Sequence, residues 1–251
     1  MDLGIRDRFI RLWNEYFGGA ELPIVFYYTD DERRAELVKP GAGPRCIMGH
    51  LTKVRHGESL GFNFDSVGCP GGKRYLGFTD VILPRFEYFL SCGKPGVMEG
   101  ERYKKSPEIV RQFMENMPEL KAPAKFIVFK RWDALEEADN PEVVIFFARP
   151  DLLSGLFTLA NFDQVEPAVV APFGSGCMSI IQHPYLEKES ACPKAILGMF
   201  DVSARPYVPE DTLTFAAPMN RFVTMIHNMD ESFLITSSWE KVLNRTSKQG
   251  G

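Results

Sequence analysis

The sequence has little cysteine and no closely spaced pair of cysteines. Five cysteines are spread over 251 residues, which is too sparse for a disulfide-stapled scaffold, and an odd number cannot pair off completely within one chain. No Cys-x-x-Cys motif is present, so the short ligand spacings of zinc fingers and ferredoxins are absent. If the cysteines bind a metal, the fold must bring distant ones together.

The sequence also lacks long apolar runs and long basic runs. No stretch approaches ~18 uninterrupted apolar residues, which argues against a membrane-spanning helix. Residues 1–19 mix charged with apolar side chains, a pattern that predicts an amphipathic helix and not a signal peptide. The formal net charge is -4, which argues against nucleic acid as a partner. We therefore expect a cytoplasmic protein.

The overall composition is that of an ordinary globular chain. Hydrophobic residues make up 45% and charged residues 25% of the sequence, which excludes extended disorder, collagen-like and coiled-coil structures. The length admits one large domain or two small ones. The choice between them depends on internal similarity.

Two series of similar segments follow one another in the same order. Each begins with a β-rich apolar run and a helix-like segment, at residues 23–28 and 30–38 and again at 143–147 and 150–160. A glycine-rich loop then leads into a cysteine, at 40–46 and 172–177. Each series continues with Cys-Pro and a Leu-Gly-x-x-Asp-Val strand pattern, and ends with a proline-initiated helix, at 69–81 and 107–117 and at 192–202 and 218–229.

We interpret these series as an internal duplication, with units at about residues 20–120 and 140–232. Each unit is expected to contain strand, helix, loop, helix, strand and helix, which predicts an α+β or α/β fold. Because neither unit alone buries much surface, we expect one domain over residues 1–251 with a shared pseudo-twofold sheet core. Residues 126–129 predict an extra strand. A capping box at Ser237 predicts a C-terminal helix from about residue 236, followed by a frayed tail at 244–251.

Several motifs resemble one family. The segment from Gly68 to Phe78, the RCIMGHL segment at Cys46, the FGSGC loop and the DVSARP segment are together similar to the uncharacterised ArCR family of archaea and anaerobic bacteria. The similarity extends from about Pro23 to about Met229. It implies a cysteine-bearing protein of low-oxygen physiology, and it brings no assigned activity.

The paired cysteines suggest a metal centre. If the pseudo-twofold axis brings the two loops and the two Cys-Pro turns together, four thiolates could hold an iron–sulfur cluster or a zinc ion. The predicted ligands are Cys46, Cys69, Cys177 and Cys192. Cys92 has no counterpart in the second unit and could replace one of them.

A second interpretation places ligand chemistry at the glycine loops. Backbone N–H groups at a helix N-terminus bind anions and lower the pKa of a cysteine there. Cys46 and Cys177 are therefore candidate nucleophiles or redox thiols, with His50 and His183 as candidate bases. The candidate ligand-binding residues are Gly41, Gly43, Gly174, Ser175, Gly176 and Arg205.

The third interpretation is structural. Cysteine is among the most buried residue types, and Arg205 could pair with Asp201. Three functions stay open: an iron–sulfur or metal-binding redox accessory protein with a redox partner protein, an enzyme or sensor of a small anionic molecule, and a non-catalytic interaction protein. The sequence does not define the oligomeric state.

Overall fold

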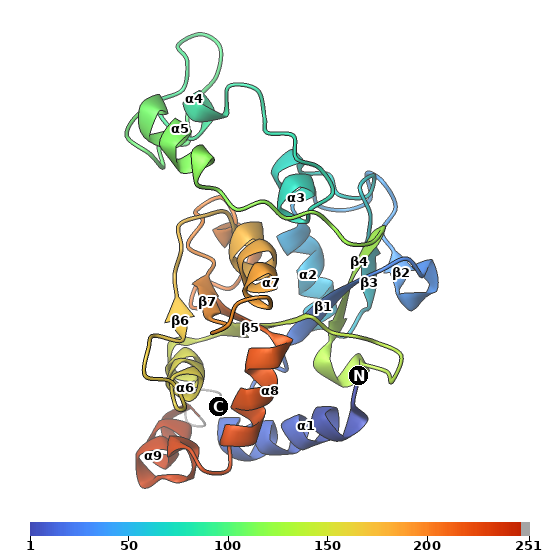
Figure 1. The fold of residues 1–251 in the computed structure, drawn as a ribbon, viewed down its shortest axis with the longest axis vertical. Helices are drawn as coiled ribbons and strands as arrows, with labels where there is room; N and C mark the ends of the chain where they lie inside the picture. Colours follow the sequence, from blue (N-terminus) through green and yellow to red (C-terminus); the bar gives the residue numbers. More distant parts are fainter. Residues whose placement is uncertain (247–251) are drawn as a thin grey trace.

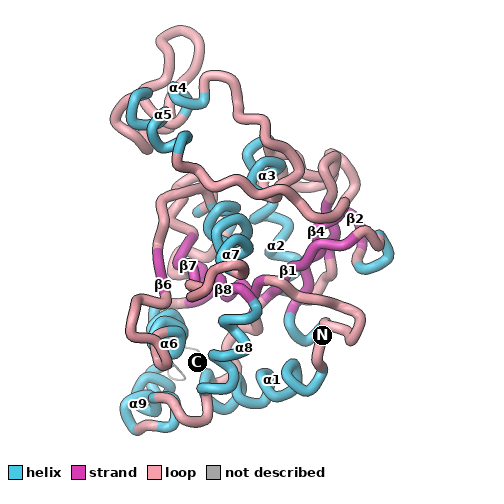
Figure 2. The backbone as a smooth tube through the Cα atoms, in the orientation of Figure 1, coloured by secondary structure: helices cyan, strands magenta, loops and turns pink. Residues whose placement is uncertain are grey.

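A single mixed sheet runs through the chain, and helices cover both of its faces (Figures 1 and 2). A computed structural model describes residues 1–246. In that part of the chain the sheet has eight strands in the order β2-β3-β4-β1-β5-β8-β7-β6. The strands are β1 (Ile24–Thr29), β2 (Glu36–Leu37), β3 (Leu60–Phe62), β4 (Phe126–Arg131), β5 (Val143–Ala148), β6 (Val169–Val170), β7 (Ala195–Gly198) and β8 (Leu213–Pro218).

The strand order is symmetric about the centre of the sheet. From one edge inward the order is β2-β3-β4-β1, and from the other edge inward it is β6-β7-β8-β5. β1 and β5 pair antiparallel at the centre, with Ile24 opposite Ile145. The two outermost pairs, β2 with β3 and β6 with β7, are parallel, and the remaining neighbours are antiparallel. The central strands are apolar along nearly their whole length because both faces of the sheet are covered.

Successive side chains of each strand enter two separate cores. On one face, alternate residues such as Phe26 and Ile145 pack against α2 (Ile47–Arg55), the π-helical segment η3 (Met178–Gln182) and α7 (His183–Glu187). On the other face, Val25 and Phe146 pack against four helices. These helices are α1 (Leu3–Phe17), α6 (Pro150–Ala160), α8 (Met219–Asn228) and α9 (Ser237–Thr246).

The long connection between β3 and β4 carries three helices: α3 (Pro70–Tyr75), α4 (Phe86–Phe89) and α5 (Pro107–Glu115). α3 lies on the α2 side of the sheet, and α4 and α5 extend away from it (Figure 2). Short 3₁₀ turns complete the fold: η1 (Glu32–Arg34), η2 (Trp132–Ala134), η4 (Arg205–Tyr207) and η5 (Phe233–Ile235).

Several predicted elements are confirmed. The N-terminal helix is α1, the helix expected at 150–160 is α6, and the extra strand is β4. The two proline-initiated helices are α5 and α8. The C-terminal helix α9 continues to Thr246, so fraying does not begin at Asn244. The remainder of the predicted tail, residues 247–251, lies outside the described residues.

Two predicted elements are wrong. The helix expected at 30–38 is a single 3₁₀ turn, which the side chain of Asp31 caps, and it leads directly into β2. The strand expected at 73–81 is instead α3 and a turn, because Cys69 caps the helix and Gly77 ends it in a left-handed conformation with φ +78°. By strand register, the Leu-Gly of β7 occupies the sheet position of Gly61-Phe62 in β3, and not that of Leu76-Gly77.

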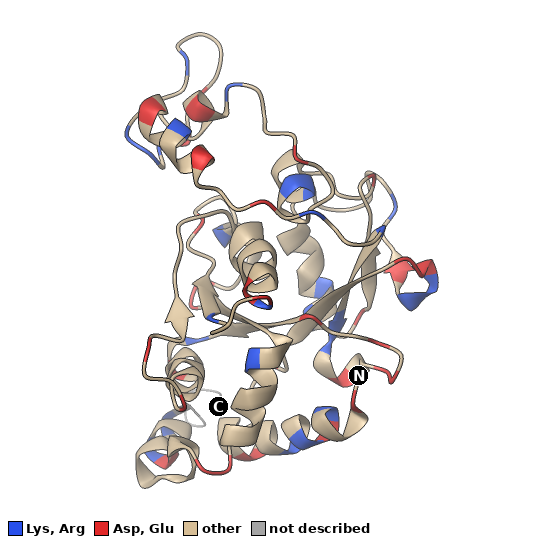
Figure 3. Ribbon diagram, viewed as in Figure 1, with Lys and Arg blue, Asp and Glu red and all other residues tan. Residues whose placement is uncertain are grey.

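No helix within residues 1–246 is long and apolar enough to cross a membrane. Basic and acidic residues are interspersed along the fold (Figure 3).

Candidate functional site

Three cysteines from separate parts of the sequence each lie at the start of a helix. Cys46 is the N-cap of α2, Cys69 is the N-cap of α3, and Cys177 immediately precedes η3. Cys46 and Cys69 have extended backbone conformations, which is what an N-cap position requires. These helices lie on the same side of the sheet (Figure 1).

The backbone packing brings the three starting points together. A Cβ on Gly68 would lie 3.3 Å from Cα of Arg45, so the chain entering Cys69 lies directly against the chain entering Cys46. α3 also contacts η3, which follows Cys177. We refer to Cys46, Cys69 and Cys177 as the three-thiol site.

Burial raises the pKa of two thiols of the three-thiol site, Cys46 and Cys177. Cys177 is only 9% exposed, and burial raises its pKa well above the ordinary value, with further increases from the charges of Cys46, Cys69 and Asp201. The pKa of Cys46 is raised for the same reasons, although hydrogen bonds from the backbone of Met48 and Gly49 act in the opposite direction. The expectation of lowered pKa values at Cys46 and Cys177 is therefore wrong, because desolvation outweighs the helix N-terminus.

Asp201 holds the loop that precedes Cys177. Its Oδ2 accepts a hydrogen bond from the backbone N–H of Gly176 at 2.9 Å. Its Oδ1 accepts hydrogen bonds from the backbone N–H and the hydroxyl of Ser203, at 3.0 and 2.8 Å. The loop amide that was expected to bind an external anion thus already binds an internal carboxylate. Ser175 caps the start of η3 by accepting from the N–H of Met178.

Tyr75, the last residue of α3, lies near the three-thiol site. Its side chain is buried, and burial, together with the charges of Cys177, Cys69 and Asp201, raises its pKa to about 12. Sequence reasoning missed Tyr75 because nothing in its local pattern separates it from a core aromatic. The position of Asp201 directly after β7 is the signal that could have suggested its role.

The other predicted ligands lie elsewhere. Cys192 is exposed in the loop between α7 and β7, and Cys92 is exposed after α4. Cys192 therefore does not complete a set of four with the three-thiol site. Within residues 1–246, no group of three or more His, Cys, Asp or Glu side chains is close enough together to hold a single metal ion.

Two of the remaining candidates, Arg205 and His50, have structural contacts. Arg205 donates to the backbone carbonyls of Pro209, Glu210 and Thr212, so its guanidinium holds its own loop and does not pair with Asp201. Nε2 of His50 lies 3.0 Å from the carbonyl of Pro44. His183 is not hydrogen-bonded at Nε2, and burial lowers its pKa.

The first glycine loop also has a local structural role. Gly41 and Gly43 both adopt φ +75°, a conformation that side chains rarely tolerate. A Cβ on Gly43 would lie 3.0 Å from the ring of His50. The loop therefore lets the chain turn closely over α2 before it reaches Cys46.

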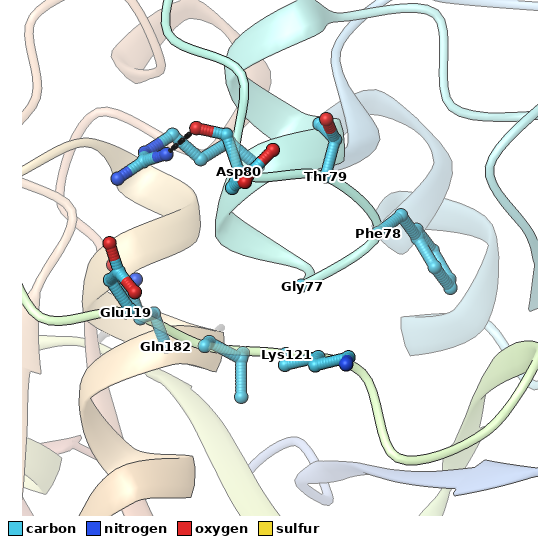
Figure 4. A pocket seen from close by; sticks show the side chains of 9 residues that line it. Gly77, Phe78, Thr79, Asp80, Glu119, Lys121 and Gln182 are labelled. Atoms are coloured by element: carbon cyan, nitrogen blue, oxygen red, sulfur yellow. Dashed lines mark hydrogen bonds between the residues drawn. The ribbon is translucent and has the colours of Figure 1, made fainter.

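A pocket of about 420 Å³ lies at the end of α3 that is opposite Cys69 (Figure 4). Two charged segments and η3 form its walls. It is lined by Arg74, Gly77, Phe78, Thr79, Asp80, Glu119, Leu120, Lys121 and Gln182. Sequence reasoning did not find this pocket, because its walls come from three segments that only the fold brings together.

A comparison with protein families gives one match. The model of the family described as uncharacterised ArCR, DUF169, matches residues 15–228. The chain belongs to this family. The match extends over all eight strands and includes all five cysteines and the pocket. No curated protein and no solved structure matches the chain.

Proposed function

We propose that Cys46, Cys69 and Cys177 hold an iron–sulfur cluster, and that the chain is a redox accessory protein. The observation that carries this proposal is the convergence of three cysteines that are distant in sequence at the starts of α2, α3 and η3. Cysteine thiolates are the ligands that iron–sulfur clusters use.

The raised thiol pKa values favour a metal centre over a free nucleophile. A nucleophilic cysteine needs a lowered pKa, whereas burial raises the pKa of Cys46 and Cys177. A bound cation reverses this penalty, because coordination deprotonates a thiol outright. The buried Cys177 and the partly buried Cys46 are thus suited to a site whose charge is supplied by the metal.

The spacing favours a cluster over one ion. A single zinc ion needs thiolate sulfurs at ~2.3 Å from a common centre, and no such group exists within the described residues. A cluster is itself several atoms wide, so its ligands lie farther apart than those of one ion. A donor set of three thiols would leave one iron of a cluster without a cysteine ligand.

The chain contributes burial and orientation to this site. Gly72 donates its N–H to Sγ of Cys69 at 3.4 Å, and hydrogen bonds to sulfur are one of the factors that set a cluster's potential. Asp201 fixes the loop before Cys177. A bound cluster would supply one-electron transfer, which requires a redox partner protein to deliver or accept the electron.

We also infer that the fold arose by internal duplication, with revised units at residues 24–131 and 143–218. The symmetric strand order supports this inference. So does the equivalent position of Cys46 and Cys177 after β2 and β6, each directly before a helix on the same face. Cys69 lies in the long connection of the first unit, where the second unit has only a short loop. The third ligand would thus be an addition to a symmetric pair.

Anaerobic reconstitution with iron and sulfide tests the proposed centre. The visible charge-transfer absorption should form in the wild type and should be lost in C46S, C69S and C177S. The matched controls are C92S and C192S, which change the two exposed cysteines and should keep the absorption. Equal absorption in all five variants, or none in the wild type, would overturn the proposal.

A further inference from the structure

Arg74 differs from the other buried cations of the described chain. Three Lys or Arg residues are at most 8% exposed: Arg74, Lys130 and Arg221. Lys130 pairs with Asp139 at 2.9 Å and Arg221 pairs with Asp163. Arg74 has no carboxylate partner among residues 1–246. Buried charges are normally paired because desolvation is costly. An anion beside Arg74 would therefore stabilise its buried charge, and residues 1–246 do not supply one.

The contacts of Arg74 leave most of its donors unused. Its Nη1 donates to the backbone carbonyl of Asp80, and its buried Nε has no hydrogen-bond partner. Gln182, which is 1% exposed, also lines the pocket. Its amide nitrogen donates to the carbonyl of Pro118 at 2.8 Å, while Oε1 has no donor. The pocket wall thus contains one unused cationic donor and one unused acceptor, both deeply buried.

The pocket is held in shape by a close backbone contact. Gly77 accepts a hydrogen bond from the N–H of Ala122 at 2.9 Å, and a Cβ at Gly77 would lie 2.5 Å from that nitrogen. The segments on either side of this contact therefore form opposite walls of the pocket, with Thr79 and Asp80 across from Glu119 and Lys121 (Figure 4).

We propose that this pocket binds a small monocarboxylate that also carries a hydroxyl or amino group. The carboxylate pairs with Arg74, whose planar guanidinium suits carboxylate geometry. The hydroxyl or amino group donates to Oε1 of Gln182.

The flanking charges define the ligand further. Lys121 is exposed at the pocket and adds a second positive charge. Asp80 and Glu119 are also exposed there, and their carboxylates oppose ligands with several negative charges. A ligand with a single negative charge and a neighbouring donor satisfies all of these groups better than phosphate does.

Calorimetric titration at pH 7 and low ionic strength tests the proposal with four probes. The probes are lactate, alanine, propionate and inorganic phosphate. Propionate lacks the hydroxyl or amino group that would donate to Gln182. We expect lactate or alanine to bind more tightly than propionate. R74Q should weaken that binding by at least about tenfold, the effect of losing one charge-assisted hydrogen bond. K73Q removes a charge from the same helix outside the pocket lining and should leave the binding unchanged.

A second variant separates binding from misfolding. E119Q removes an exposed negative charge from the pocket and should tighten propionate binding, an increase that a damaged fold would not produce. Absence of saturable binding by any carboxylate would overturn the proposal. So would binding that R74Q leaves intact, an unchanged propionate affinity in E119Q, or phosphate binding more tightly than every carboxylate. The titrations need no metal, so they fail or succeed independently of the iron–sulfur proposal.

Discussion

The pKa of a cysteine at a helix start depends on which of two opposing effects is larger. Hydrogen bonds from the first turn favour the thiolate, and burial disfavours it. At Cys46 and Cys177 burial is the larger effect. The same helix position would produce a reactive thiol only if solvent reached it.

We predict slow alkylation of the buried Cys177 thiol. In the metal-free protein at pH 8, Cys177 should react with iodoacetamide at least about tenfold more slowly than the exposed Cys192, because burial keeps the reagent out and also raises the pKa of Cys177. Cys92 serves as a second exposed reference. Mass spectrometry of the digested peptides gives each rate. Equal labelling of Cys177 and Cys192 would show that Cys177 is not buried.

Asp139 provides a prediction for stability and pH. It is 1% exposed and accepts hydrogen bonds from Tyr27, Lys130 and the N–H of Glu136. Burial alone would raise its pKa, but these donors outweigh burial and lower it. A lowered folded-state pKa means that the stabilisation is complete above the unfolded value near ~3.9 and is lost as pH falls through the folded value.

D139N should therefore cost about 3–5 kcal/mol of unfolding free energy at pH 7, because it removes the close partner of the buried Lys130 and leaves only the exposed carboxylate of Glu136 at 3.8 Å. D133N, which breaks the more exposed pair with Arg131, should cost no more than about 1 kcal/mol. Urea unfolding at pH 7 and at pH 3 measures both. The difference in unfolding free energy between the wild type and D139N should be smaller at pH 3 than at pH 7. A larger difference at pH 3 would contradict a lowered pKa of Asp139.

Helix η3 and strand β7 approach each other closely, and a glycine permits the contact. A Cβ at Gly198 would lie 2.4 Å from the Cβ of Ser179 and 2.9 Å from Oγ1 of Thr214. All three residues are buried. This contact sets the distance between the sheet and the helix that follows Cys177.

G198A should destabilise the protein by about 1–3 kcal/mol through overpacking. The matched control is G71A, because a Cβ there would lie at an ordinary 3.5 Å from Tyr75. Alanine is the better helix former by ~1 kcal/mol, so G71A should be neutral or stabilising. Thermal unfolding of the two variants measures the difference. Equal melting temperatures would argue against the close contact.

Local sequence signals predicted the elements that begin with a characteristic residue or consist of a long apolar run. Proline at the helix start marked α5 and α8, and apolar β-rich runs marked β1 and β5. The same reasoning failed at residues 73–81, where the Leu-Gly pattern of a strand occurs just after a short helix. It also missed β3, because three residues are too few for a periodic pattern. Tertiary pairing alone makes that segment a strand.

The sheet as a whole explains why the site was only partly predictable. The sequence predicted that Cys46 and Cys177 would converge across a symmetric core, and the two lie on the same face of the sheet, after β2 and β6. It paired Cys69 with Cys192 because both precede proline. In the fold Cys69 follows β3 and Cys192 precedes β7, so the shared dipeptide does not mark equivalent positions. Arg74 and Gln182 could not be predicted, since burial of a polar side chain is a property of the assembled fold.

The most direct test of the account is the content of iron and acid-labile sulfide in protein reconstituted without oxygen, measured for the wild type, C69S and C192S. We expect the wild type and C192S to bind both elements in matching amounts, and C69S to bind neither stably. Retention of the full iron and sulfide by C69S, or wild-type protein that binds no iron, would contradict a shared centre at Cys46, Cys69 and Cys177.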